Sequence, residues 1–157
     1  MASISEREYR EIEAANASGH TPVVFIQGLW LLPSSWANWA DLSTQAGYAP
    51  LTPDWPDDPD TVDQARANPG ALAKKTLEQV AGHTTEIINA LEKKPAVMGH
   101  SNGGLLAQML AGRDCRRPRN CGVTEIVKMP NRGHSLTIDH GWREVAQTTL
   151  DFVKRFA

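Results

Sequence analysis

The residues with the clearest chemical potential lie at positions 99–103, where the chain reads Gly-His-Ser-Asn-Gly. The apolar run Pro95–Met98 before them predicts a strand, and Leu105–Gly112 after them predicts a helix. This is the nucleophile-elbow pattern, in which the flanking glycines leave room for a tight, strained turn that exposes the serine hydroxyl. Ser101 is therefore the candidate nucleophile. A glycine-rich phosphate-binding turn is the alternative explanation of the same residues.

A serine hydroxyl is a weak nucleophile and needs a base within hydrogen-bonding distance. His134 is the candidate, because it lies in the loop Pro130–Asp139 after a predicted strand at Val123–Met129. Loops at the carboxyl ends of parallel strands meet at one rim of a sheet, so this loop should emerge beside Ser101. A loop histidine that merely caps the final helix is the alternative. His100 flanks the serine and is expected to point away from it.

An acyl-transfer reaction also needs two backbone N–H groups to bind the negatively charged oxygen that develops. The amide of Asn102, directly after the serine, is the first candidate, and the amide of Leu29, in the loop after the first predicted strand, is the second. Trp30 and Leu31 in the same loop are candidates for contacting an apolar acyl or alcohol group. Packing in the core is the simpler explanation of these two side chains.

Alternating strands and helices must position these residues. Short apolar runs predict strands, and capping signals followed by amphipathic spacing predict helices. The pattern favours an α/β fold, a three-layer α/β/α sandwich with a short, mostly parallel sheet of about four strands. The strands are expected at 23–26, 48–52, 95–98 and 123–129, and the helices at 5–17, 34–46, 61–68, 71–93, 105–112 and 140–156.

Composition limits the classes of function. A length of 157 residues suits a single domain over 1–157, with 1–20 as an N-terminal helix and linker. The net charge of −2 argues against a nucleic-acid binder, and no apolar run is long enough to span a membrane. A polar N-terminus makes the cytoplasm the expected location. No cofactor or metal is expected, and Cys115 and Cys121 are either free thiols or a small disulfide loop.

The chain resembles the α/β-hydrolase superfamily, in its lipase and esterase-like branch. The residues that carry the resemblance are the strand and loop at 23–30, the elbow at 99–104 and Gly133-His134. The resemblance implies a serine hydrolase with an oxyanion loop, a nucleophile elbow and a terminal histidine. Two features depart from the family. Gln27 stands where a histidine is usual, and the short connection 113–122 replaces a cap region and two core strands.

The missing region normally carries the acid of the catalytic triad. Asp139, at the expected rim, is the candidate replacement, although its simpler role is to cap the final helix. Asp114 is excluded because it follows the elbow helix and should lie at the opposite rim. Asp54 follows the second strand, on the side of the first strand away from His134. A Ser–His dyad without an acid is the remaining arrangement.

These observations predict a serine hydrolase that cleaves small carboxylic esters, with a small-molecule ester as its binding partner. A hydrolase-fold scaffold that has lost its activity with its acid is the alternative, and a cofactor-free perhydrolase or lyase is a third reading. With strands missing, Val123–Met129 should form an exposed sheet edge. Such an edge favours pairing with a second copy, so we expect a tendency to form a homodimer or to aggregate.

Overall fold

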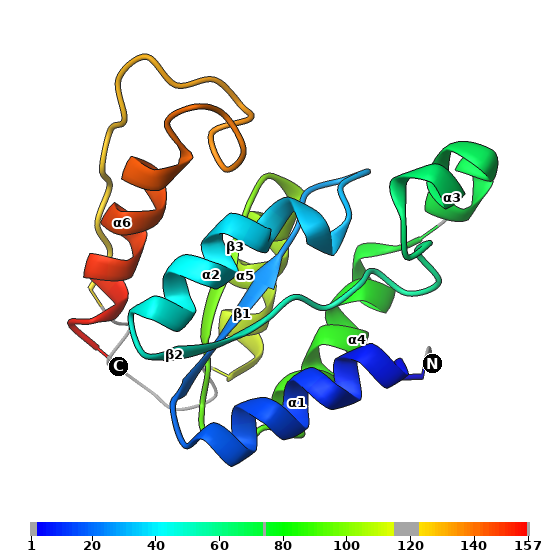
Figure 1. Cartoon of the computed structure of the whole chain (residues 1–157), viewed down its shortest axis with the longest axis horizontal. Coiled ribbons are helices and arrows are strands. Elements are labelled where there is room, and N and C mark those ends of the chain that lie inside the picture. Colours follow the sequence, from blue (N-terminus) through cyan, green and yellow to red (C-terminus); the bar gives the residue numbers. More distant parts are fainter. Residues whose placement is uncertain (1–2, 74, 115–122, 157) are drawn as a thin grey trace.

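The computed structural model describes residues 3–73, 75–114 and 123–156. Three parallel strands form its sheet: β1 (Thr21–Ile26), β2 (Tyr48–Leu51) and β3 (Ala96–Gly99), in the order β2-β1-β3. Helices cover both faces of the sheet (Figure 1). The expected three-layer α/β/α arrangement is therefore confirmed, with the sheet reduced to three strands in the described residues.

The central strand β1 organises the two apolar layers. Its side chains are buried on both faces, as a continuous β-branched and aromatic run predicts. Val24 and Ile26 belong to a cluster with residues of α1 (Glu6–Ser18), α4 (Leu77–Asn89) and α5 (Asn102–Asp114). Val23 and Phe25 belong to a second cluster, with residues of α2 (Ala37–Gln45) and α6 (Trp142–Val153). Strand alternation thus assigns each helix to one side of the sheet.

Polar residues set where several helices begin. Ser5 caps α1 in a capping box with Glu8, and Gly19, at φ 66°, ends the helix. Thr76 caps α4 in the same way with Gln79, so the predicted helix 71–93 starts only at Leu77. The remaining helical elements are the 3₁₀ turns η1 (Pro33–Trp36) and η2 (Pro69–Leu72) and the short helix α3 (Val62–Ala67).

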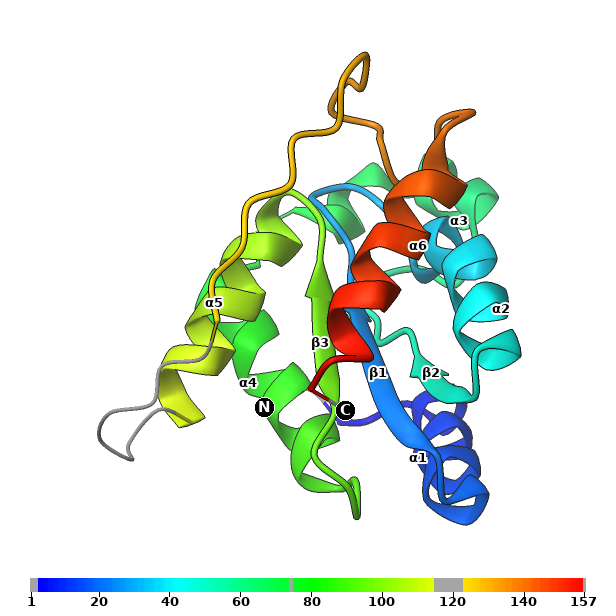
Figure 2. The ribbon, with the colours of Figure 1, turned by 90° about the vertical axis from the view of Figure 1, so that its left-hand side faces the viewer.

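The predicted strand at 123–129 is wrong. These residues run past the sheet toward the carboxyl ends of the strands and pair with none of them (Figure 2). Val123, Ile126 and Val127 are exposed. An apolar β-branched run forms a strand only where a neighbouring backbone satisfies its hydrogen bonds. Among the described residues, the two edges of the sheet are therefore β2 and β3, and this segment forms neither of them.

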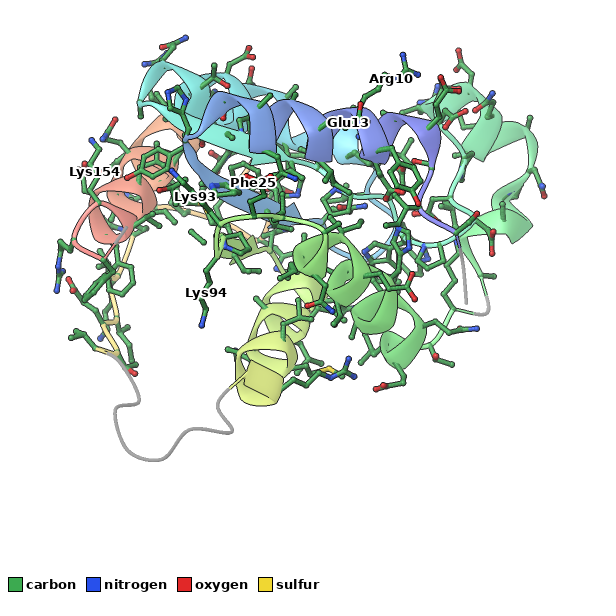
Figure 3. The ribbon with its side chains drawn as sticks, turned by 90° about the horizontal axis from the view of Figure 1, so that it is seen from below. Arg10, Glu13, Phe25, Lys93, Lys94 and Lys154 are labelled. Carbon is green, nitrogen blue, oxygen red and sulfur yellow. The ribbon has the colours of Figure 1, made fainter. Side chains whose placement is uncertain are left out.

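Buried charges attach α1 to the rest of the domain. The Glu8 carboxylate hydrogen-bonds His83 Nε2 of α4 at 2.8 Å and accepts the Asp54 amide at 3.0 Å. Arg7 donates to the Asp54 carboxylate at 2.7 Å. On the opposite face of α1, Arg10 and Glu13 point away from the layer that holds Phe25 (Figure 3). These bonds hold α1 against α4 and against the loop that follows β2. They also give Asp54 a structural role.

Candidate active site

The backbone at Ser101 has the left-handed conformation that a nucleophile elbow requires. Its φ is 58°, strained for a residue with a side chain, and Gly103 N–H donates to the His100 carbonyl to close the turn. A Cβ at Gly99 would overlap the carbonyl of Gly103, and one at Gly103 would overlap the carbonyl of Ile26. The close approach of three backbone segments therefore explains both glycines.

The structure brings His134 to Ser101. The His134 Nε2 atom lies 3.0 Å from the serine Oγ, within hydrogen-bonding distance, although the two residues are separated by 33 positions. His134 is exposed, so the pair opens to solvent. This is the geometry in which an imidazole can take the proton of a serine hydroxyl.

Three contacts hold the loop that carries His134. The buried His100 ring donates from Nε2 to the backbone carbonyl of His134 at 2.6 Å. Arg132 donates to Glu144 of α6 at 2.8 Å. Trp39 donates from its indole nitrogen to the Thr137 carbonyl at 2.9 Å. The elbow, α6 and α2 thus each hold the loop that carries His134, although no described strand precedes this loop.

The acid predicted for the triad is not placed on the histidine. The Asp139 carboxylate accepts the Gly141 N–H at 2.8 Å, because a tight turn, in which Ser135 accepts the Asp139 N–H, directs it toward the start of α6. Asp54 lies beyond β1 and pairs with Arg7. Its burial raises its pKa, and Arg7 partly offsets this. Within the described residues, the only hydrogen bond of the His134 side chain is to Ser101.

The two candidate oxyanion amides lie on segments that start side by side. Ile26 and Gly99 are paired at the ends of β1 and β3, so the loop after each strand begins at the same rim. A Cβ on Gly28 would lie 3.1 Å from the Cβ of Ser101, which brings the loop that carries Leu29 against the serine. Asn102 begins α5 directly after the nucleophile. Glycine at position 28 is what allows this approach.

Trp30 and Leu31 lie away from the pair. Trp30 has a φ of 64° and a side chain that is 72% exposed. Both residues line a pocket with α3 and η2 that does not include Ser101. They were predicted to contact the substrate because they follow Gly28 in sequence, but the left-handed turn at Trp30 carries them outward. A different and larger cavity, of about 970 Å³, has Ser101 and His134 in its lining.

A model of the Alpha/beta hydrolase family matches residues 23–124, which are 102 of the 157 residues. The chain belongs to the α/β-hydrolase family. The match includes β1, the elbow and α5, while His134 lies beyond it. No individual protein of curated function and no solved structure shows significant similarity to this hydrolase. The domain is a short form of the fold, consistent with the brief connection 113–122.

The described residues of this hydrolase assemble no group of three or more metal-ligating side chains. None of its described helices is long and apolar enough to cross a membrane. Cys115 and Cys121 lie outside the described residues, so their pairing stays open.

Two functional contacts were missed from the sequence. For His100 the sequence predicted only that it points away from Ser101, yet its ring supports the loop that carries His134. No role was predicted for Arg132, because its separation of 12 residues from Glu144 matches no helical spacing. A histidine beside the nucleophile and a glycine-flanked histidine loop are the only hints that the sequence offers for the first contact.

Proposed function

We propose that this α/β hydrolase cleaves carboxylic esters through an acyl-enzyme formed on Ser101. The observation that carries the proposal is the 3.0 Å hydrogen bond between His134 Nε2 and Ser101 Oγ at a strained elbow. The N–H groups of Asn102 and Leu29 would bind the developing oxyanion. Ser101 and His134 are both exposed, which leaves the pair accessible to an ester from solution.

The reaction has two acyl-transfer steps. Ser101 Oγ attacks the ester carbonyl carbon while its proton passes to His134 Nε2. The tetrahedral intermediate collapses, the carbon–oxygen bond to the alcohol breaks, and the alcohol leaves with the proton from His134. A water molecule then attacks the acyl-enzyme, giving its proton to His134, which returns it to Ser101 as the carboxylic acid departs.

A Ser–His dyad is the arrangement that the described residues support. An acid on the second imidazole nitrogen normally holds the tautomer and stabilises the imidazolium. Since no described carboxylate bonds to His134, we expect a turnover well below that of an acid-assisted triad. The same observation favours the second candidate, a hydrolase-fold scaffold with little or no activity.

Hydrolysis of p-nitrophenyl acetate separates the two candidates. The wild type should release p-nitrophenol above the buffer rate, and Ser101→Ala and His134→Ala should both return to it. His20→Ala, an exposed histidine in a turn, is the matched control and should keep the wild-type rate. Equal rates in wild type and Ser101→Ala would leave the scaffold as the better description.

A further inference from the structure

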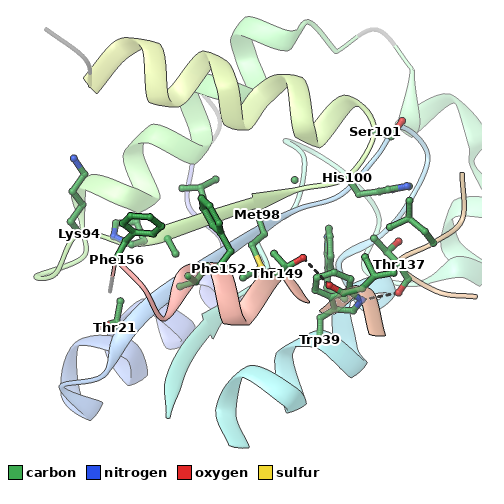
Figure 4. A pocket seen from close by; sticks show the side chains of 18 of the residues that line it. Thr21, Trp39, Lys94, Met98, His100, Ser101, Thr137, Thr149, Phe152 and Phe156 are labelled. Carbon is green, nitrogen blue, oxygen red and sulfur yellow. Dashed lines mark hydrogen bonds between the residues drawn. The ribbon is translucent and has the colours of Figure 1, made fainter. Parts of the chain in front are cut away.

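The cavity beside the catalytic pair extends far from the reacting atoms. It follows the free edge of β3 from Ser101 and His134, at the carboxyl end, to Lys94 and Pro95, at the amino end. In Figure 4, Ser101 and His100 lie at one end of it, and Phe152 and Phe156 lie toward the other. Its volume of about 970 Å³ is at the upper end of what small-molecule sites occupy.

The walls of this cavity are mainly apolar. Val97 and Met98 of β3 form one side of the cavity. The other side is formed by three apolar side chains of α6: Val145, Phe152 and Val153. Trp36 and Trp39 line it as well. Two polar side chains in the lining already bond to backbone carbonyls, Thr149 to Val145 and Trp39 to Thr137. We call this cavity the β3 groove.

The β3 groove exists because nothing described pairs with β3 on its outer side. In its place α6 and the segment beginning at Val123 leave an apolar space that starts at the nucleophile. A ligand with a reactive carbonyl at one end and a long hydrocarbon tail matches both features. Burial of the tail would be driven by the hydrophobic effect and needs no further polar partner.

We propose that the β3 groove binds the acyl chain of the ester, which makes medium- and long-chain acyl esters the preferred substrates. The proposal rests on the proposed function and names the substrate class of the same site. It also moves substrate recognition from Trp30 and Leu31 to the opposite side of Ser101. A strand from a second copy of the chain is the competing occupant of the groove.

Chain-length dependence tests the proposal. For p-nitrophenyl esters from acetate to octanoate, kcat/KM of the wild type should rise by up to about fourfold per methylene, the value expected for full burial. Thr149→Trp, which fills the groove from α6, should flatten the rise in kcat/KM with chain length. Thr148→Trp is the matched control, since Thr148 makes the equivalent hydroxyl bond to Glu144 but does not line the groove. A flat wild-type profile, or the same rise in Thr149→Trp, would overturn the proposal.

A binding measurement keeps this test separate from catalysis. In Ser101→Ala protein, 2-bromododecanoate should quench tryptophan fluorescence, because its bromine lies beside the carboxylate and Trp39 lines the groove near the Ser101 end. Thr149→Trp combined with Ser101→Ala should lose that saturable quenching. Absent ester hydrolysis with intact quenching would refute the proposed function and retain the groove as an acyl site. Absent quenching, together with a dimer in sedimentation that Thr149→Trp dissociates, would assign the groove to a second copy.

Discussion

The buried pair Glu8–His83 allows a quantitative prediction about folding. Burial alone would raise the pKa of Glu8, but the hydrogen bonds from His83 and from the Ser5 amide outweigh it and lower the pKa from 4.5 to about 2. A carboxylate whose pKa is lower by this amount in the folded state than in the unfolded state contributes about 3 kcal/mol to the free energy of unfolding, when it is ionised in both states. The pair joins α1 to α4, so its loss should weaken the whole domain.

Glu8 sets the lower pH limit of this stabilisation, and His83 sets the upper limit. The folded pKa of Glu8 is lowered, so its contribution is present above pH 4.5 and is lost as the pH falls toward 2. The hydrogen bond to Glu8 raises the pKa of His83 above 6.5, against the effect of burial. Its contribution is present below pH 6.5 and is lost as the pH rises through the raised value. The pair therefore stabilises the fold most between these limits.

Urea unfolding of Glu8→Gln measures the effect. At about pH 5.5, inside the predicted window, the free energy of unfolding should fall by about 3 kcal/mol relative to the wild type, and the difference should shrink as the pH approaches 2. Glu13→Gln, on the exposed side of the same helix, should change little at any pH. A loss that is independent of pH, or no greater than that of Glu13→Gln, would refute the electrostatic reasoning.

Two predictions concern the catalytic loop. Asp139→Asn keeps an oxygen for the Gly141 N–H and should leave ester hydrolysis within about twofold of the wild type, whereas a loss of about 10⁴-fold, as expected for a triad acid, would contradict the dyad. His100→Phe removes the hydrogen bond to the His134 carbonyl and should lower kcat about fivefold, the value of one hydrogen bond, with KM and the melting temperature little changed. An unchanged kcat in His100→Phe would show that the loop needs no support from this ring.

Local signals in the sequence were enough to predict the elbow and the layers. The glycines around Ser101 are needed for a tight turn, and the apolar run of β1 is needed for a strand that is buried on both faces. Both requirements appear as short sequence patterns, so both features could be predicted. The order β2-β1-β3 agrees with the side expected for Asp54, which the resemblance to the family implied. The proximity of His134 to Ser101 follows from the same rule of shared rims.

Features that depend on missing neighbours could not be predicted. Residues 123–127 have the composition of a strand, but a strand requires a partner backbone. Within the part of the chain that the structure describes, no strand pairs with this segment, and the sequence alone does not reveal this. The β3 groove arises from the same vacancy in the sheet. The direction of Trp30 depends on a left-handed turn that bulky residues rarely adopt, so its outward position was unexpected.

The most direct test of the central claim is covalent labelling of Ser101 by a fluorophosphonate, measured by intact-protein mass spectrometry and peptide mapping. We predict one adduct per chain, located on Ser101, absent from Ser101→Ala and strongly slowed in His134→Ala. An unlabelled wild type that is folded by circular dichroism, or an adduct on another residue that persists in Ser101→Ala, would contradict the claim that His134 activates this serine.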